Sequence, residues 1–117
     1  LMMPQEYKDF LDAKGIPYRE TRDLDGNIND CDILYMTRVQ QERFTDPMEY
    51  EKVKNTYNLT ASMLAGAKKN MKILHPLPRV TETAQDVDDT PHAYYFKQAE
   101  NGVYVRMAII AYLLGYK

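Results

Sequence analysis

The chain has 117 residues and a mass of 13.7 kDa, which is enough for one domain with a modest core and small for a complete α/β enzyme. Hydrophobic residues make up 44% and charged residues 27% of the sequence, a globular balance that argues against an intrinsically disordered chain. With 15 basic and 17 acidic residues the net charge is −2, so we expect neither nucleic acid nor an anionic membrane as a partner.

The cysteine content and the apolar runs limit the compartment and the kinds of site. Cys31 is the only cysteine, which rules out an intramolecular disulfide, and with only two histidines the sequence argues against a metal site. No charged-then-apolar signal peptide opens the sequence. The longest apolar stretch, residues 107–114, is far shorter than the roughly 18 to 20 residues of a membrane helix. We therefore expect a cytoplasmic protein with no cofactor, no metal and no membrane partner.

The first predicted element is an amphipathic helix between Pro4 and Gly15, because proline is favoured in a first turn and glycine just past a last one. Its apolar residues at helical spacing are Tyr7, Phe10 and Leu11. Residues 16–20 are the best candidate for a following strand, and residues 23–30 for a turn or a short helical segment.

Two further helices are predicted in the middle of the chain. Thr45 or Asp46 caps the first of them, with Pro47 in its first turn, and this helix should run to about residue 57. A short helix begins at residues 60–64.

Two short apolar runs, at residues 33–36 and 71–74, predict buried strands separated by these helices. Residues 82–87 and 92–98 are predicted to be short helical pieces. Residues 101–116 form a last helix that is apolar on most sides, so we expect it to be covered. Alternation of helices with buried strands predicts an α/β fold with a parallel sheet.

Polar residues follow the first of these strands. Arg38 presents a planar fork of donors that matches a carboxylate in bidentate fashion. Gln40 would point the same way if the chain is still extended there. The two side chains could therefore bind a ligand carboxylate together with a ligand amine or carbonyl.

The second strand runs into the turn His75-Pro76-Leu77-Pro78-Arg79. Each proline lacks a backbone N–H and moves its predecessor out of the helical region, so carbonyl groups of the turn stay unpaired. In parallel α/β sheets, small ligands bind outside the carboxyl ends of the strands. A rigid turn there, flanked by His75 and Arg79, suits an anionic ligand.

Together these motifs resemble the catalytic chain of the aspartate carbamoyltransferase family. The resemblance is carried by Tyr-Met-Thr-Arg-Val-Gln at 35–40, Glu-Arg-Phe at 42–44, the turn at 75–79, and His-Ala-Tyr-Tyr-Phe-Lys-Gln-Ala at 92–99. It covers essentially all 117 residues and falls on the C-terminal half of the family's chain, which binds L-aspartate.

The resemblance implies a three-layer Rossmann-like fold. Residues 1–100 would form an L-aspartate-binding domain, and residues 101–117 a helix that crosses back to a carbamoyl-phosphate domain. The Ser-Thr-Arg-Thr loop with which the family grips phosphate does not occur in this sequence. Leu1 corresponds to a point just past the first strand of this half, so the chain is expected to be truncated at its N-terminus.

The resemblance also implies roles for individual residues. Arg38 would bind a carboxylate of L-aspartate and Gln40 would contact the same substrate. Glu42 would pair with Arg38 and hold its fork in orientation. The backbone carbonyls of Leu77 and Pro78 would accept hydrogen bonds from the amino group of carbamoyl phosphate, and the Leu77–Pro78 bond is a candidate cis peptide.

Other residues are expected to support the site. His75 is interpreted as a core or capping histidine, because the family's catalytic histidine belongs to the other half. Arg79 and Glu82 form either a surface pair or, as we favour, an orienting contact for the turn. Arg106, in the apolar last helix, should take part in a structural salt bridge. Residues 94–96 are expected to be packing aromatics.

The function implied by the resemblance is transfer of the carbamoyl group of carbamoyl phosphate to L-aspartate, giving N-carbamoyl-L-aspartate and phosphate in pyrimidine biosynthesis. The complete catalytic chains are expected to form a homotrimer, and this chain alone to be inactive. The sister enzyme for ornithine would carry a cysteine in place of Pro76. The alternative is a free-standing, non-catalytic fragment that acts as a ligand-binding or structural subunit.

Overall fold

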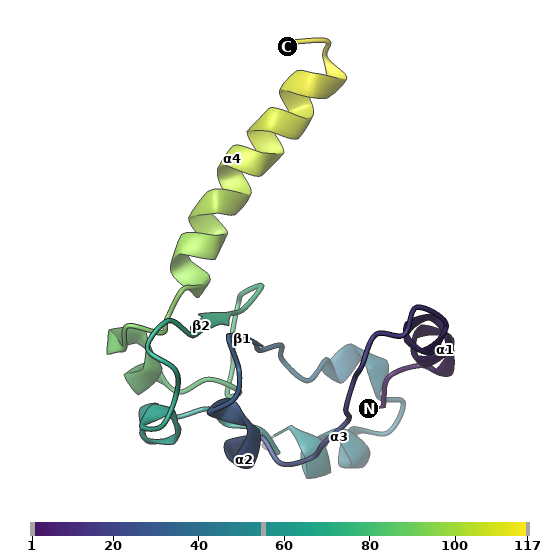
Figure 1. Ribbon diagram of the computed structural model, residues 1–117, viewed down its shortest axis with the longest axis vertical. Coiled ribbons are helices and arrows are strands. Elements are labelled where there is room, and N and C mark those ends of the chain that lie inside the picture. Colours follow the sequence, from purple (N-terminus) through teal and green to yellow (C-terminus); the bar gives the residue numbers. More distant parts are fainter. Residues whose placement is uncertain (1, 55, 117) are drawn as a thin grey trace.

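The computed structural model describes residues 2–54 and 56–116. Its elements in chain order are α1 (Gln5–Ala13), α2 (Asp25–Ile28), β1 (Ile33–Tyr35), the 3-10 helix η1 (Gln41–Arg43), α3 (Pro47–Val53), the 3-10 helix η2 (Ala61–Leu64), β2 (Lys72–Leu74), the 3-10 helix η3 (Gln85–Asp89) and α4 (Tyr95–Leu113). Figure 1 shows β1 and β2 side by side at the base of the molecule, with α4 rising away from them.

The described sheet consists of β1 and β2, which pair in parallel. Tyr35 lies opposite Leu74, and the N–H of Met36 donates to the carbonyl of Leu74 at 2.8 Å as the last contact of the pair. The two strands end level with each other, so the segments that follow them emerge side by side. Parallel strands joined through helices confirm the predicted α/β fold.

The core lies around β2. Its buried members are Ile28, Met36, Leu59, Leu64, Met71, Ile73, Val87 and Tyr95. Ile73 is the buried residue of β2, and Tyr95 is the buried first residue of α4. The segment before α4 runs beside β2, because the N–H of Ile73 donates to the carbonyl of His92 at 2.8 Å and the N–H of Tyr94 donates to the carbonyl of Ile73 at 3.0 Å.

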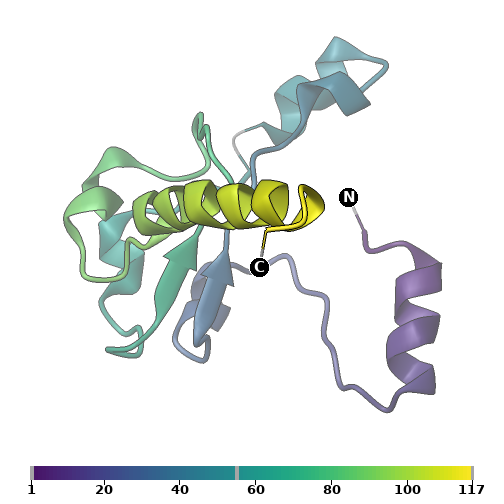
Figure 2. The same ribbon diagram turned by 90° about the horizontal axis from the view of Figure 1, so that it is seen from above.

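Two helices extend away from this core (Figures 1 and 2). The radius of gyration is 17.2 Å, whereas a compact chain of this length would have one of about 13 Å. The outward side chains of α4 are more than half exposed, among them Met107 at 61% and Ile110 at 58%. On α1, Tyr7 and Phe10 are similarly exposed. The cover expected for the last helix is therefore not supplied by the described residues.

Most element boundaries agree with the sequence. The helix bounded by Pro4 and Gly15 forms, with Gly15 at φ +63°. Asp46, rather than Thr45, caps α3, because its carboxylate accepts the N–H of Met48 at 2.8 Å. The predicted end of this helix near residue 57 is too late, since α3 ends at Val53.

Four further expectations about the elements are wrong. The first strand is not buried along its length, because Ile33 and Tyr35 of β1 are 56% and 53% exposed. Residues 16–20 form no strand, because no other strand lies beside them within the described part of the chain. Residues 92–98 are not a separate helical piece, because α4 runs unbroken from Tyr95 through Gly102. Helical structure in the segment predicted at 82–87 starts only at Gln85, since Thr83 is extended and bridges to Leu59.

None of the helices within residues 2–54 and 56–116 combines the length and apolar character needed to cross a bilayer. The predicted domain at residues 1–100 begins with Leu1 and the predicted crossing helix at 101–117 ends with Lys117, and both of these residues lie outside the described part of the chain.

Candidate functional site: a pocket at the carboxyl ends of the strands

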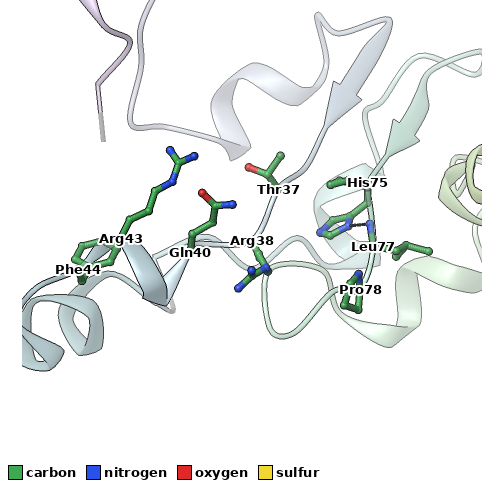
Figure 3. A pocket seen from close by; sticks show the side chains of 9 residues that line it. Thr37, Arg38, Gln40, Arg43, Phe44, His75, Leu77 and Pro78 are labelled. Atoms are coloured by element: carbon green, nitrogen blue, oxygen red, sulfur yellow. Dashed lines mark hydrogen bonds between the residues drawn. The ribbon is translucent and has the colours of Figure 1, made fainter.

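A pocket of about 490 Å³ lies where β1 and β2 end (Figure 3). The segment after β1 contributes Thr37, Arg38, Gln40, Arg43 and Phe44, and the turn after β2 contributes His75, Pro76, Leu77 and Pro78. The two parallel strands end at the same level, so the segments that follow them lie side by side although they are about 35 residues apart in the chain. The structure thus brings together both groups of residues that the sequence assigned to a ligand.

Arg38 and Glu42 form a bidentate ion pair on the first wall of the pocket. Arg38 Nη2 lies 2.6 Å from Glu42 Oε1, and Nη1 lies 3.3 Å from Oε2. A backbone N–H and the Arg38 guanidinium hold the pKa of the Glu42 carboxyl below its usual range. The predicted pairing is confirmed. It orients the guanidinium while leaving its other N–H donors available to a ligand.

Gln40 lies beside Arg38 on the same wall. Its backbone is extended, with φ −80° and ψ 102°, but the side chains do not point the same way as expected: in Figure 3 that of Gln40 points up from the chain and that of Arg38 points down. The 3-10 helix η1 begins directly after it and carries Glu42 back toward Arg38.

His75 forms the inner support of the second wall. Its Nδ1 accepts the backbone N–H of Leu77 at 2.9 Å (dashed in Figure 3), and its Nε2 lies 2.7 Å from Glu82 Oε1. A backbone N–H can only donate, so Nδ1 is unprotonated and Nε2–H donates to the Glu82 carboxylate. Both ring nitrogens are occupied within the chain, which agrees with a capping histidine.

Glu82 is buried beneath the same turn. Its carboxylate accepts the N–H of Val80 at 3.2 Å and that of Thr81 at 3.0 Å, in addition to the contact with His75. Burial opposes ionisation, yet the backbone N–H groups of Glu82 itself and of Val80, together with His75, hold the pKa of Glu82 below its usual range. An ionised Glu82 therefore fixes the backbone of the turn from inside.

The turn itself has an uncommon backbone. The Leu77–Pro78 peptide bond is cis, as predicted, and Leu77 has φ +53°. Residues other than glycine seldom adopt a positive φ, and those that do cluster at binding and active sites. The backbone of this turn is thus fixed in one unusual shape at the edge of the pocket.

Arg79 does not pair with Glu82, so the surface pair considered from the sequence is wrong. Arg79 instead makes a bidentate ion pair with Asp88, with Nη2 to Oδ2 at 2.5 Å, and Nη1 donates to the Tyr95 hydroxyl at 3.1 Å. The guanidinium also lies over the Tyr95 ring, 5.6 Å from its centre. These contacts tie the residue after the turn to η3 and to the start of α4.

The charges in this cluster reinforce one another. The ion pair with Asp88 raises the pKa of Arg79, and the same contact lowers that of Asp88. Burial, together with the hydrogen bond to Asp88, raises the pKa of Tyr95 to about 12. The cluster therefore keeps its ion pair and its neutral phenol across the whole physiological pH range.

Some residues behave differently from the sequence expectation. Arg106 forms no ion pair with any other residue in the described part of the chain and lies on exposed α4, so the expected salt bridge does not form there. Tyr95 packs in the core as expected, whereas Phe96 is 55% exposed. Thr37 and Arg43 line the pocket although no role was predicted for them; their nearness to Arg38 was the available signal.

The pocket offers a charged group and a shaped backbone to a ligand. It combines a cation on one wall with a rigid turn rich in backbone carbonyls on the other. Among the described residues, no group of three or more potential metal ligands comes together. Such an arrangement can bind and orient an anionic ligand against a second ligand that carries N–H groups.

Comparison with known proteins agrees with this arrangement. Residues 3–113 match the family described as aspartate/ornithine carbamoyltransferase, Asp/Orn binding domain. The chain is 59% identical over 116 residues to the aspartate carbamoyltransferase catalytic subunit of Bacteroides fragilis, covering 98% of this chain and 38% of that relative.

Solved structures give the same result for the fold. The catalytic subunit of M. jannaschii aspartate transcarbamoylase superposes with a TM-score of 0.83 at 47% identity, over 97% of this chain and 37% of that one. Trypanosoma cruzi aspartate transcarbamoylase in complex with carbamoyl phosphate and aspartate gives 0.79 at 34% identity, over 91% of this chain and 35% of that one. The chain thus spans little more than a third of the length of these relatives.

Proposed function

This chain belongs to the aspartate/ornithine carbamoyltransferase family, whose Asp/Orn-binding domain it matches, and we propose that it is the L-aspartate-binding part of an aspartate carbamoyltransferase. The complete enzyme would transfer the carbamoyl group of carbamoyl phosphate to L-aspartate, giving N-carbamoyl-L-aspartate and phosphate in pyrimidine biosynthesis. We expect it to work in the cytoplasm, without a cofactor or metal.

The observation that carries this proposal is the pocket at the carboxyl ends of β1 and β2. In it Arg38 would bind a carboxylate of L-aspartate, with Gln40 beside it contacting the same substrate. The carbonyls of Leu77 and Pro78 would accept hydrogen bonds from the carbamoyl amino group. The related Trypanosoma cruzi enzyme is known in complex with carbamoyl phosphate and aspartate, which supports these two compounds as the substrates.

The chemistry asks mainly for positioning. The amino nitrogen of L-aspartate attacks the carbonyl carbon, a C–N bond forms, and the C–O bond to phosphate breaks with its electron pair leaving on phosphate. The attacking nitrogen passes a proton to the departing phosphate. Arg38, held by Glu42, and the turn, held by His75 and Glu82, would orient the two substrates for this step.

Arginine at position 38 and proline at position 76 favour aspartate over ornithine as the acceptor. A guanidinium recognises a carboxylate, which is the side-chain group of aspartate. The enzyme for ornithine is expected to carry cysteine where this chain has Pro76. The 59% identity to a relative named for aspartate supports the same choice.

The remaining parts of the enzyme would complete the site. We propose that residues 1–100 form the L-aspartate-binding domain and that residues 101–117 cross to a carbamoyl-phosphate domain, whose groups would grip the phosphate. The exposed apolar side chains of α4, such as Met107 and Ile110, support a covering surface of that kind. Complete catalytic chains would assemble as a homotrimer.

Arg38→Ala in the complete enzyme tests the aspartate assignment. Loss of a charge-assisted contact should raise the KM for L-aspartate by about tenfold to a hundredfold. The Kd of carbamoyl phosphate should change little, because Leu77 and Pro78 are untouched. Lys69→Ala, an exposed lysine that does not line the pocket, is the matched control. Equal damage to the use of both substrates would contradict the assignment.

The competing function is a non-catalytic ligand-binding or structural fragment, which the short span of this chain relative to its relatives favours. An assay of this chain with and without a carbamoyl-phosphate domain separates the two. We expect turnover only with that domain present. Binding of L-aspartate without turnover in either case would favour the fragment.

A further inference from the structure

A single side chain of α4, that of Gln98, reaches both strand ends at the pocket. Its Oε1 accepts the backbone N–H of His75 at 2.9 Å, and its Nε2 donates to the Tyr35 hydroxyl at 3.2 Å. Tyr35 is the last residue of β1, and His75 directly follows β2. The amide therefore joins the two strands at the point where both walls of the pocket begin.

The backbone holds Gln98 in this place. The segment before α4 is paired with β2 through Ile73, and the N–H of Gln98 then donates to the carbonyl of Tyr94 at 2.8 Å as part of the first turn of α4. The helix start is also anchored by the buried Tyr95. The position of Gln98 above His75 is thus fixed by backbone pairing and core packing.

The hydrogen bond from the His75 N–H to Gln98 satisfies a buried donor at the start of the turn. His75 is buried, and within the described residues its N–H has no acceptor other than Gln98. A buried backbone N–H without a partner is costly, so the turn would have to move if Gln98 were removed. The next contact in the series runs from His75 Nδ1 to the N–H of Leu77.

We propose that Gln98 is a positioning residue, which sets the turn at 75–78 through His75 and couples that turn to the placement of α4. This rests on the proposed function, in which the turn binds the carbamoyl amino group. A side chain on α4 then controls where the carbonyls of Leu77 and Pro78 lie, without itself touching substrate. A change in the position of α4 alters the turn through the same contact.

Variants of the complete enzyme test the proposal by kinetics. Gln98→Met keeps the length of the side chain and removes both hydrogen bonds. Gln98→Glu keeps an acceptor for the His75 N–H and can accept from the Tyr35 hydroxyl, which then donates. Lys97→Met is the matched control, because Lys97 is on the exposed side of α4 and pairs with Glu100 at 2.8 Å.

We expect Gln98→Met to lower kcat by about tenfold or more and to raise the KM for carbamoyl phosphate. The KM for L-aspartate should change much less, because Arg38 and Gln40 lie on the other wall. Gln98→Glu should restore most of the activity, and Lys97→Met should match the wild type. A purely structural role would lower stability without this split between the substrates.

Hydrogen exchange of the His75 and Leu77 amides gives a readout that does not depend on turnover. Both amides should exchange faster in Gln98→Met than in the wild type or in Gln98→Glu. If Gln98→Met does not fold, Tyr35→Phe removes only the Nε2 contact and should raise the KM for carbamoyl phosphate by about threefold.

Wild-type kinetics and amide exchange in Gln98→Met would overturn the proposal. So would a Gln98→Glu variant that fails to restore wild-type kinetics and exchange. If Tyr35→Phe has to replace Gln98→Met, wild-type values in Tyr35→Phe would overturn it as well. A complete wild-type enzyme without carbamoyl transfer would instead reject the proposed function. The exchange measurement would still decide the role of Gln98 in that case.

Discussion

The core around β2 with the adjoining turn at 75–82, here called the base, and the helix α4 place the same kinds of residue in opposite environments. Ile73 in β2 is fully buried, whereas Ile110 in α4 is 58% exposed. The base also buries one ionisable pair in a closed network, that of Glu82 with His75. The base therefore holds itself together with contacts inside this chain, while α4 carries a surface that gains stability only when something covers it.

The ion pairs show the same contrast. Arg79 and Asp88 each have 21% of the side chain exposed, whereas Lys97 and Glu100 on α4 have 52% and 51% exposed. Solvent screens the second pair and leaves its long side chains mobile, so it contributes little. The first pair is shielded and also bonds Tyr95, so it fixes geometry beside the pocket.

The largest expected effect comes from truncating Ile73, with Ile110 as the comparison. Ile73→Ala should lower the free energy of unfolding by about 2–5 kcal/mol, because it leaves a cavity in the core. Ile110→Ala in this chain alone should change it by less than about 0.5 kcal/mol. In the complete enzyme, where α4 is proposed to be covered, the cost of Ile110→Ala should rise. Urea unfolding of both variants in both contexts measures this, and equal costs in the chain alone would remove the contrast.

Glu82→Gln should have the next largest effect. An amide cannot accept from all the donors that the buried carboxylate satisfies, so unfolding should become easier by about 1.5–3 kcal/mol. Glu100→Gln on α4 is the control and should have no measurable effect.

The loss of unfolding free energy in Glu82→Gln should depend on pH, and the direction of that dependence follows from the pKa of Glu82. The pKa of Glu82 is lowered in the folded state, so its contribution is present above the unfolded value of about 4.3. That contribution is lost as the pH falls through the folded pKa. The difference in unfolding free energy between wild type and Glu82→Gln should therefore shrink on acidification, as urea unfolding at a series of pH values would show. A difference that stays constant with pH would mean that Glu82 is not the titrating group.

The smallest expected effect separates the two ion pairs. A double-mutant cycle of Arg79→Ala and Asp88→Ala should give a coupling free energy of about 1 kcal/mol or more. The same cycle for Lys97 and Glu100 should give no measurable coupling. Thermal unfolding of the single and double variants provides both numbers. Comparable coupling in the two pairs would show that shielding at the base has no energetic consequence.

Several features could be predicted from the sequence because they depend on near neighbours in the chain. Glu42 lies four residues after Arg38, and their ion pair forms as expected. Asp46 followed by Pro47 specifies the start of α3. The turn after β2, with its cis Leu77–Pro78 bond, was also expected from its residues and from the family resemblance.

Contacts between distant residues could not be predicted in the same way. Asp88 became the partner of Arg79 only because η3 places it there, although Glu82 is closer in sequence. Residues 16–20 have the composition of a strand but lack a neighbouring strand in the described structure. A strand needs a pairing partner, and local sequence does not say which segment will lie alongside.

The sequence by itself therefore determined the α/β class, the two strands and the residues at their carboxyl ends, because hydrophobic periodicity and turn chemistry act locally. Only the tertiary structure decided how those ends are locked together. Gln98 meets His75 and Tyr35 across 23 and 63 residues of chain, and the equal length of the paired strands brings Arg38 and Leu77 to one pocket. Such contacts depend on strand register and on where a helix begins in space, and these are set by packing of the whole core.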